Sequence, residues 1–334
     1  MTMDRLDVDV QACSPRIKIT LTRVGVKNVK KLVKIARTGG KRPIILISNF
    51  HMFVNLPNDI KGANMSRNLE AMYEVLNEAV NSEVYDVEDL CSEVAKRLLE
   101  RHKYATTAEV GMKSVYMLTR KTPVMKISCQ EPATIFAEAK AYRSSRSTNL
   151  HSQDEESGVC IKKVMGVEIA GMTTCPCAQE LMRENAVEEL AKRGMSRRDS
   201  DAFLNSIPLA THNQRGRGTI SIEVENDVKI PVGKMIEIIE KSMSTKTYEI
   251  LKRPDEAKVV ETAHQKPMFV EDCVREMAKR VVESFDYLPD DSIITLTQVN
   301  EESIHQHDAI AERVATIGDL RRELNGLNEN AGVA

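Results

Sequence analysis

Residues Ile44–Val54 read IILISNFHMFV, an apolar run rich in β-branched side chains that predicts a strand. Arg16–Val26, before it, alternates polar and apolar residues and predicts another strand. After it, a helical period starts at Asn64, and Val87–Arg101 predicts a second helix, because apolar residues recur on one face of each. Two strand-like segments close the series: Val110–Leu118 and Ala133–Tyr142. The predicted order is ββααββ.

The second half of the chain repeats this order without repeating the sequence. Ser144–Gly158 is polar and almost free of apolar residues, which predicts a linker. The elements expected after it are strands at Val159–Met172, Thr219–Glu225 and Ile293–Val299, and helices at Cys175–Arg193, Val232–Met243 and Phe269–Phe285. Strands in adjacent pairs favour two packed α+β halves, residues 1–150 and 151–334, over a doubly wound sheet. We find no GxGxxG or P-loop pattern.

Composition narrows the class of protein. The chain has 334 residues, 42% hydrophobic and 29% charged, which is enough for a buried core. A net charge of −2 argues against a nucleic-acid binder, because neutralising phosphates needs a basic excess. Seven cysteines in no compact spacing do not suggest a disulfide framework. Met1–Arg16 has no apolar signal core, and no run is long enough for a membrane span. We expect a cytoplasmic protein that does not bind membranes.

Three short motifs hold groups that bind metals. Cys175–Cys177 reads CPC, His212–Arg215 reads HNQR and Ile304–His307 reads IHQH. Thiolate, imidazole and carboxylate ligands together suit Zn²⁺ or Fe²⁺. Each motif also has an ordinary interpretation: buried thiols in a turn, a solvated loop, or surface histidines at a helix start. If the fold brings the motifs together, they predict a metal-dependent hydrolase.

The sequence allows more than one interpretation of two acidic motifs. Lys252–Glu256 reads KRPDE and suits a solvated turn. Phe269–Asp272 reads FVED and begins a predicted helix, where a carboxylate complements the helix dipole. Alternatively, Glu271 or Asp272 accepts paired N–H donors from a ligand. Of the other histidines, His102 and His151 are expected at the surface, and His264 is undecided.

Taken in order, CPC, HNQR, LKRPDE, PxFVED and IHxH resemble the type IB GTP cyclohydrolases. Thr173–Glu180 and Lys61–Arg67 resemble the archaeal branch of that family, and the likeness spans about Arg16 to Ile310. The resemblance implies a bimodular tunnelling fold whose ββααββ-like halves assemble into a barrel. It also implies a homo-oligomer, dimer or tetramer, with sites at subunit junctions.

The resemblance further implies that a metal-activated water opens the imidazole ring of GTP. Formate and diphosphate leave, and the ring recloses as 7,8-dihydroneopterin 2′,3′-cyclic phosphate, which feeds methanopterin or folate-type synthesis. The expected cofactor is Fe²⁺, one per subunit, with Zn²⁺ or Mn²⁺ as substitutes.

Carried over by motif, the metal-site positions are Cys175, His212, His305 and His307, with Glu256 as a conditional ligand. Glu271 matches the carboxylate that holds the guanine edge, so Cys175, His212 and Glu271 are the expected catalytic residues. The cations available for the triphosphate are Arg215, Lys252, Arg253, Lys61 and Arg67. Two departures from bacterial relatives agree with the archaeal pattern: a long insert between Cys175 and His212, and Asn64 in place of a histidine.

Other interpretations remain. A nitrile reductase with the same fold would use its cysteine as a covalent nucleophile and NADPH as reductant. A pterin synthase, or a binding protein that has kept the pocket without the chemistry, would also fit.

Overall fold

The structure is a computed structural model that describes residues 10–35, 43–81, 87–143, 158–225 and 228–331. The first half follows the predicted order. Its elements are β1 (Leu21–Ile35), β2 (Ile44–Leu56), α1 (Ser66–Asn81), α2 (Val87–Arg101), β3 (Thr107–Lys121) and β4 (Ser128–Arg143). The helix at Val87–Arg101 has the predicted bounds, and β1 starts and ends later than predicted.

The second half repeats the plan with insertions. Its elements are β5 (Val159–Thr174), α3 (Pro176–Lys192), α4 (Arg197–Asn205), β6 (Asn213–Glu225), α5 (Val232–Lys241), β7 (Thr245–Lys246), α6 (Arg253–Gln265), α7 (Val270–Ser284), β8 (Ile293–Glu301), β9 (Ala309–Thr316) and α8 (Ile317–Ala331). Without α3–α4 and β7–α6, the order up to β9 is again ββααββ. The predicted α+β class is confirmed.

Several elements differ from the sequence predictions. The segments α4, α6, β7, β9 and α8 were not predicted. Lys252–Glu256, expected as a solvated turn, begins α6, because Asp255 satisfies backbone N–H groups at the helix start. Asn213–Arg215, expected in a loop before a strand, already belongs to β6.

The strands are hydrogen-bonded in the order β1-β2-β3-β4-β5-β6-β8-β9, and β7 pairs with β5. Contacts divide the chain into two compact units, which we describe separately. The first unit contains residues Met1–Val115, Ile135–Met165 and Glu223–Val228, and the second contains Tyr116–Thr134, Gly166–Ile222 and Lys229–Ala334. The linker predicted at Ser144–Gly158 lies, except for Gly158, outside the described residues, so the division at residue 150 stays a prediction.

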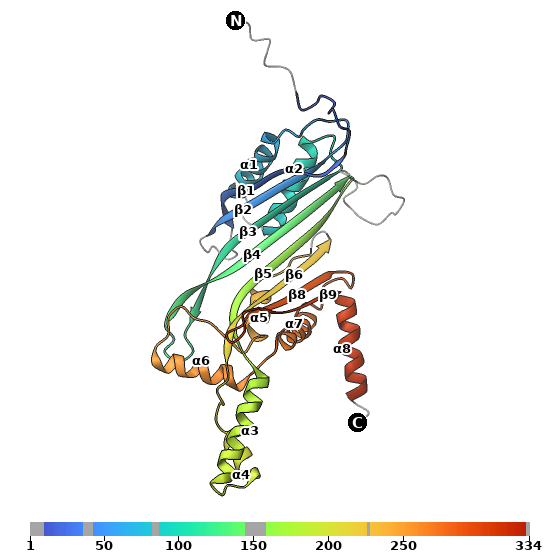
Figure 1. Cartoon of the computed structure of the whole chain (residues 1–334). Helices are drawn as coiled ribbons and strands as arrows, with labels where there is room; N and C mark the ends of the chain where they lie inside the picture. The colour runs from blue at the N-terminus through green and yellow to red at the C-terminus, as the bar shows by residue number, and fades with distance from the viewer. Residues whose placement is uncertain (1–9, 36–42, 82–86, 144–157, 226–227, 332–334) are drawn as a thin grey trace. The chain divides into compact units, whose positions relative to one another are not determined.

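In the first unit, α1 and α2 lie together on one face of the sheet (Figure 1). Strand β2 shows why: Leu46, Phe50 and Met52 are buried, whereas Ile45 and Ile47, on either side of Leu46, are exposed. Successive side chains of a strand point to opposite faces, so the buried set faces the helices. Burying each of these large apolar side chains contributes about 1.5–3 kcal/mol.

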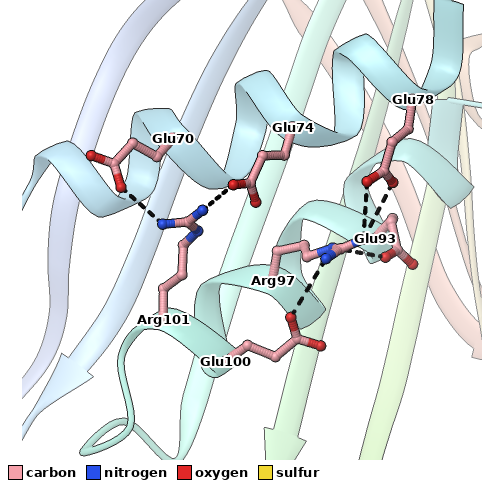
Figure 2. Close-up of polar contacts among 7 residues, drawn as sticks. All are labelled: Glu70, Glu74, Glu78, Glu93, Arg97, Glu100 and Arg101. Carbon is pink, nitrogen blue, oxygen red and sulfur yellow. Dashed lines mark hydrogen bonds and ion pairs between the residues drawn. The ribbon is translucent and has the colours of Figure 1, made fainter.

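Ion pairs tie α1 to α2 across their outer surfaces (Figure 2). Arg101 of α2 pairs with Glu70 at 2.8 Å and also with Glu74, both on α1. Arg97 pairs with Glu78 of α1 at 3.2 Å and with Glu93 of its own helix at 3.4 Å. Exposed pairs contribute only about 0.2–1 kcal/mol each, so they orient the helices more than they hold them.

In the second unit, α7 packs against β8, β9, α5 and α8. Its core includes the fully buried Met235, Ile239, Met277 and Leu296. Helices α3 and α4 contact each other and form a hairpin inserted between β5 and β6 (Figure 1). No helix in the described part of the chain is long and apolar enough to cross a membrane.

His102 is fully buried in the first unit, so its predicted surface position is wrong. His151 lies outside the described residues. His102 Nε2 lies 2.8 Å from Asn68 Oδ1, and Nδ1 lies 2.9 Å from the Tyr104 hydroxyl. Asn68 Nδ2 donates to Met52 O, which leaves Oδ1 as an acceptor for Nε2–H and Nδ1 as an acceptor for the tyrosine. Burial lowers the pKa of His102 to about 4.

This lowered pKa predicts an acid-sensitive fold. The unfolded chain takes up the proton near its ordinary pKa of about 6.5, whereas the folded chain resists protonation, so stability is lost as pH falls from about 6.5 to about 4. We expect His102→Gln to be less stable than wild type at about pH 7.5, with a smaller difference at about pH 5. Urea unfolding at both pH values measures this. An equal difference at both would contradict the burial argument.

Candidate functional site

Two of the predicted metal-site motifs are joined by their backbones. Strand β5 ends at Thr174, and the N–H of Cys175 donates to His212 O at 3.2 Å. The Thr211 hydroxyl donates to Cys175 O at 3.2 Å. The α3–α4 insert therefore leaves from and returns to one place, and Cys175 and His212 are neighbours in spite of the residues between them.

Cys175 is the N-cap residue of α3. Its extended backbone places Sγ to accept the Ala178 N–H at 3.4 Å, and Pro176 follows at the first helical position, where no N–H is needed. The thiol is half-buried, whereas the thiol of Cys177 is exposed. The first cysteine of CPC is thus the one that the fold positions.

His212 contacts the loop between β8 and β9. Its Nδ1 lies 3.3 Å from Ser303 Oγ. His305 and His307, in the same loop, are exposed, and their rings stack with centroids 5.2 Å apart. The two imidazoles therefore lie on one side of the loop. The fold brings this loop to His212, although within the described residues no group of three or more His, Cys, Asp or Glu side chains is close enough to hold a metal ion.

The start of α7 lies at the end of β5. Met268 N–H donates to Thr174 O at 3.0 Å, and α7 begins at Val270. Asp272 accepts the Phe269 N–H at 3.2 Å and pairs with Arg275 at 3.1 Å, so it caps the helix. Glu271 is exposed in the first helical turn. The structure thus assigns the capping role to Asp272, whereas the Glu271 carboxylate is exposed beside it.

At the start of α6, as in α7, one carboxylate bonds to backbone N–H groups and its neighbour is exposed. Asp255 is fully buried and accepts N–H groups of Val124 at 2.8 Å and Met125 at 2.9 Å. Burial opposes its ionisation, but these donors and the Lys252 N–H outweigh burial and lower the pKa of Asp255. Glu256, the conditional metal ligand, is exposed beside it.

The predicted phosphate-binding cations lie in both units. Arg215, Lys252 and Arg253 are exposed in the second unit. In the first unit, Lys61 is exposed before α1, and Arg67 is half-buried with Nη1 donating to Arg101 O at 3.4 Å.

Two residues that the sequence reasoning did not assign hold this region together. Gln179 donates through Nε2 to Leu209 O at 2.8 Å and to His264 O at 2.7 Å. Buried His264 lies 3.2 Å through Nε2 from Thr211 O. Both tether the chain that leads into His212. The signal for Gln179 was its place in the Thr173–Glu180 motif, two residues after CPC. The sequence around His264 gave no signal.

The fold and this cluster define a class of protein. The chain matches the family model described as Type I GTP cyclohydrolase folE2 over residues 8–311. The chain therefore belongs to this family, and the resemblance drawn from the motifs is confirmed. Membership favours the cyclohydrolase over the reductase, the pterin synthase and the binding protein.

Among its relatives are enzymes named GTP cyclohydrolase MptA. The protein from Methanococcoides burtonii is 55% identical over 316 residues, covering 95% of this chain and 96% of the relative. The protein from Methanosarcina acetivorans is 55% identical over 317 residues, covering 95% and 97%. The archaeal branch predicted from the motifs agrees with these sources.

The similarity to solved structures concerns only the fold, because the sequence identity is low. The uricase from Arthrobacter globiformis aligns with a TM-score of 0.51 at 9% identity, covering 90% of this chain and 96% of that chain. A hyper-thermostable uricase mutant aligns with a TM-score of 0.52 at 9% identity, covering 88% and 91%. The α+β fold is thus similar to the tunnelling fold of urate oxidase.

Asp255 and Glu256 allow a matched test of structural against functional carboxylates. Asp255→Asn puts an amide donor against N–H donors, so we expect the melting temperature to fall by roughly 3–8 °C. Glu256→Gln, on the exposed side of the same turn, should melt within about 1–2 °C of wild type. Thermal unfolding followed by circular dichroism measures both. Equal melting temperatures for the two variants would remove the structural role of Asp255.

Proposed function

We propose that this GTP cyclohydrolase uses a divalent metal to convert GTP to 7,8-dihydroneopterin 2′,3′-cyclic phosphate, with release of formate and diphosphate. This is the first step of methanopterin-type pterin synthesis. The observation that supports the site is the backbone hydrogen bond between Cys175 and His212, which makes residues of two distant motifs neighbours. Family membership supports the reaction.

The donor chemistry at this place fits a transition metal. Cys175 has a half-buried thiol with only a weak backbone donor, and its backbone is bonded to that of His212; a thiol and an imidazole suit Fe²⁺ or Zn²⁺. We propose Fe²⁺ as the physiological ion, held by Cys175 and His212 with His305 or His307, and with Glu256 as a conditional ligand. When bound, such an ion lowers the pKa of water towards about 7 and so supplies the nucleophile.

The remaining residues bind and orient GTP. Glu271 accepts the guanine N1–H and 2-amino donors, which one carboxylate can hold side by side. Proton transfer at N7 and N9 needs a nearby acid and base, and imidazole is the side chain type that serves as both, so we assign this role to an imidazole not engaged by the metal. The triphosphate needs cations, for which Arg215, Lys252 and Arg253 are available in the second unit and Lys61 and Arg67 in the first.

We also propose a homo-oligomer with sites at subunit junctions, built from the two halves 1–150 and 151–334. Exposed apolar side chains of the first unit support association: Leu32 and Ile47 are paired across β1 and β2 and are 65% and 71% exposed. A thiol and Fe²⁺ both need reducing surroundings, which supports a cytoplasmic location.

The test of the function is anaerobic incubation of the purified chain with GTP and Fe²⁺. Oxidation of the products should yield a fluorescent pterin, and mass spectrometry should identify the cyclic phosphate. Chelator treatment should abolish turnover and added Fe²⁺ should restore it. Full turnover in chelated, metal-free protein would overturn the metal-dependent proposal.

Replacement of each site histidine separates ligands from bystanders. His212→Asn keeps approximate size but removes a strong ligand, so we expect metal affinity to fall about tenfold or more, together with turnover. The same changes at His305 and His307 identify which of them binds. Metal analysis by mass spectrometry, with circular dichroism to check folding, measures the effect. Normal metal content and turnover in all three variants would exclude the histidines from the site.

Glu271→Gln separates recognition from metal binding. An amide donor against guanine donors should cost about 1–3 kcal/mol of binding free energy. The rate should fall as well, because the same contact positions C8. Asp272→Asn is the matched control: it should weaken the helix cap and stability while retaining GTP affinity. Wild-type affinity and rate in Glu271→Gln would show that the guanine edge is bound elsewhere.

A further inference from the structure

A cavity of about 350 Å³ lies in the first unit, on the face of the sheet opposite the one that packs on α1 and α2. Side chains from six strands line it, and none belongs to the motifs of the cyclohydrolase site. The polar and aromatic residues that matter are Arg23 on β1, His51 on β2, Glu138 and Tyr142 on β4, and Lys162 on β5.

A glycine shapes this cavity. Gly111 of β3 pairs directly with His51 of β2, and a Cβ at Gly111 would lie 2.2 Å from His51 Cε1 and Nε2. Only glycine therefore lets the imidazole lean across β3 towards β4, which carries Glu138. Burial, the largest effect, lowers the pKa of His51, although the charge of Glu138 acts in the opposite direction. The imidazole is thus neutral at neutral pH and can both donate and accept.

The cations at the cavity are already paired. Arg23 lies 2.8 Å from Glu109 and Lys162 lies 3.4 Å from Glu223. In contrast, no hydrogen bond or ion pair within the described part of the chain engages the Glu138 carboxylate. A cavity with paired cations and an unused carboxylate suits a ligand that offers N–H donors rather than a polyanion.

Flat surfaces accompany these donors and acceptors. The Arg23 guanidinium lies over the Phe53 ring at 4.1 Å, and the His51 and Phe53 rings are 5.5 Å apart. Tyr142 lines the cavity beside Glu138, and a planar ring can stack on a face of this kind. The cavity volume is within the range of small-ligand sites.

We propose that this cavity binds a planar heterocycle with a 2-amino-4-oxopyrimidine edge, a pterin or a guanine, in a second site. Glu138 accepts the ring N–H and the 2-amino group side by side, and the neutral His51 bonds the adjoining ring nitrogen or oxygen. Tyr142 stacks on the ring. The inference deepens the proposed function, because GTP and its pterin product both carry this edge.

The test is isothermal titration calorimetry on the full chain, which measures how many probe molecules bind per chain and how tightly. The two probes are 7,8-dihydroneopterin and guanosine 5′-monophosphate. We expect Glu271→Gln to retain binding of at least one probe at the second site, and Glu138→Gln to weaken that binding about tenfold or more. Glu100→Gln is the matched control: Glu100 is an exposed carboxylate of α2 that pairs with Arg97, and neither residue lines the cavity, so binding should match wild type. The tighter probe identifies the ligand as pterin or guanine.

Two results would overturn the proposal: wild-type binding of both probes in Glu138→Gln, or complete loss of binding in Glu271→Gln. Gly111→Ala should also weaken binding, because the added methyl group displaces His51 into the cavity. If Gly111→Ala does not fold, the Glu138→Gln variant alone still tests the proposal. Failure of the proposed reaction gives no turnover but leaves Glu138-dependent binding intact, so the two failures are distinguishable.

Discussion

The end of β5 is where the second unit is tied together, because buried backbone polar groups there must all find partners. Thr174 N–H donates to Ser244 Oγ at 3.2 Å, and Thr174 Oγ1 donates to Ala263 O at 2.9 Å. Thr174 O accepts from Met268, and the next N–H, of Cys175, donates to His212 O. An unmade bond at a fully buried group costs about 1–3 kcal/mol. Satisfying these groups draws four distant segments to one point, and the CPC, HNQR and FVED motifs lie beside it.

In the first turns of α6 and α7, two adjacent acidic residues have different roles. In α6 and in α7 the aspartate at the third helical position accepts the backbone N–H of the cap residue. That geometry occupies Asp255 and Asp272 and directs neither towards a ligand. The neighbouring Glu256 and Glu271 are exposed. Aspartate suits the cap because its short side chain reaches the backbone, whereas the longer glutamate extends away.

In each half of the chain, a side chain lies over a glycine of a neighbouring strand, where the missing Cβ leaves room for it. In the first unit His51 lies over Gly111. In the second, a Cβ at Gly216 of β6 would lie 2.5 Å from Gln298 Nε2, so the buried amide of Gln298 occupies that space. The repeated ββααββ plan thus carries different polar groups in each half.

The local sequence pattern was enough to predict the ββααββ order and the helix at Val87–Arg101. When one face of a helix or strand is buried, its apolar residues recur with the period of that element. Motif order was enough for the family. Local pattern missed α6, since its start is made by Asp255 bonding to Val124 and Met125, far away in the chain. Local pattern also placed His102 at the surface, because the sequence does not show that Asn68 and Tyr104 bond to its imidazole and so permit its burial. Only the tertiary structure made Cys175 a neighbour of His212, because hydrogen bonds between distant segments depend on how the strands and helices pack.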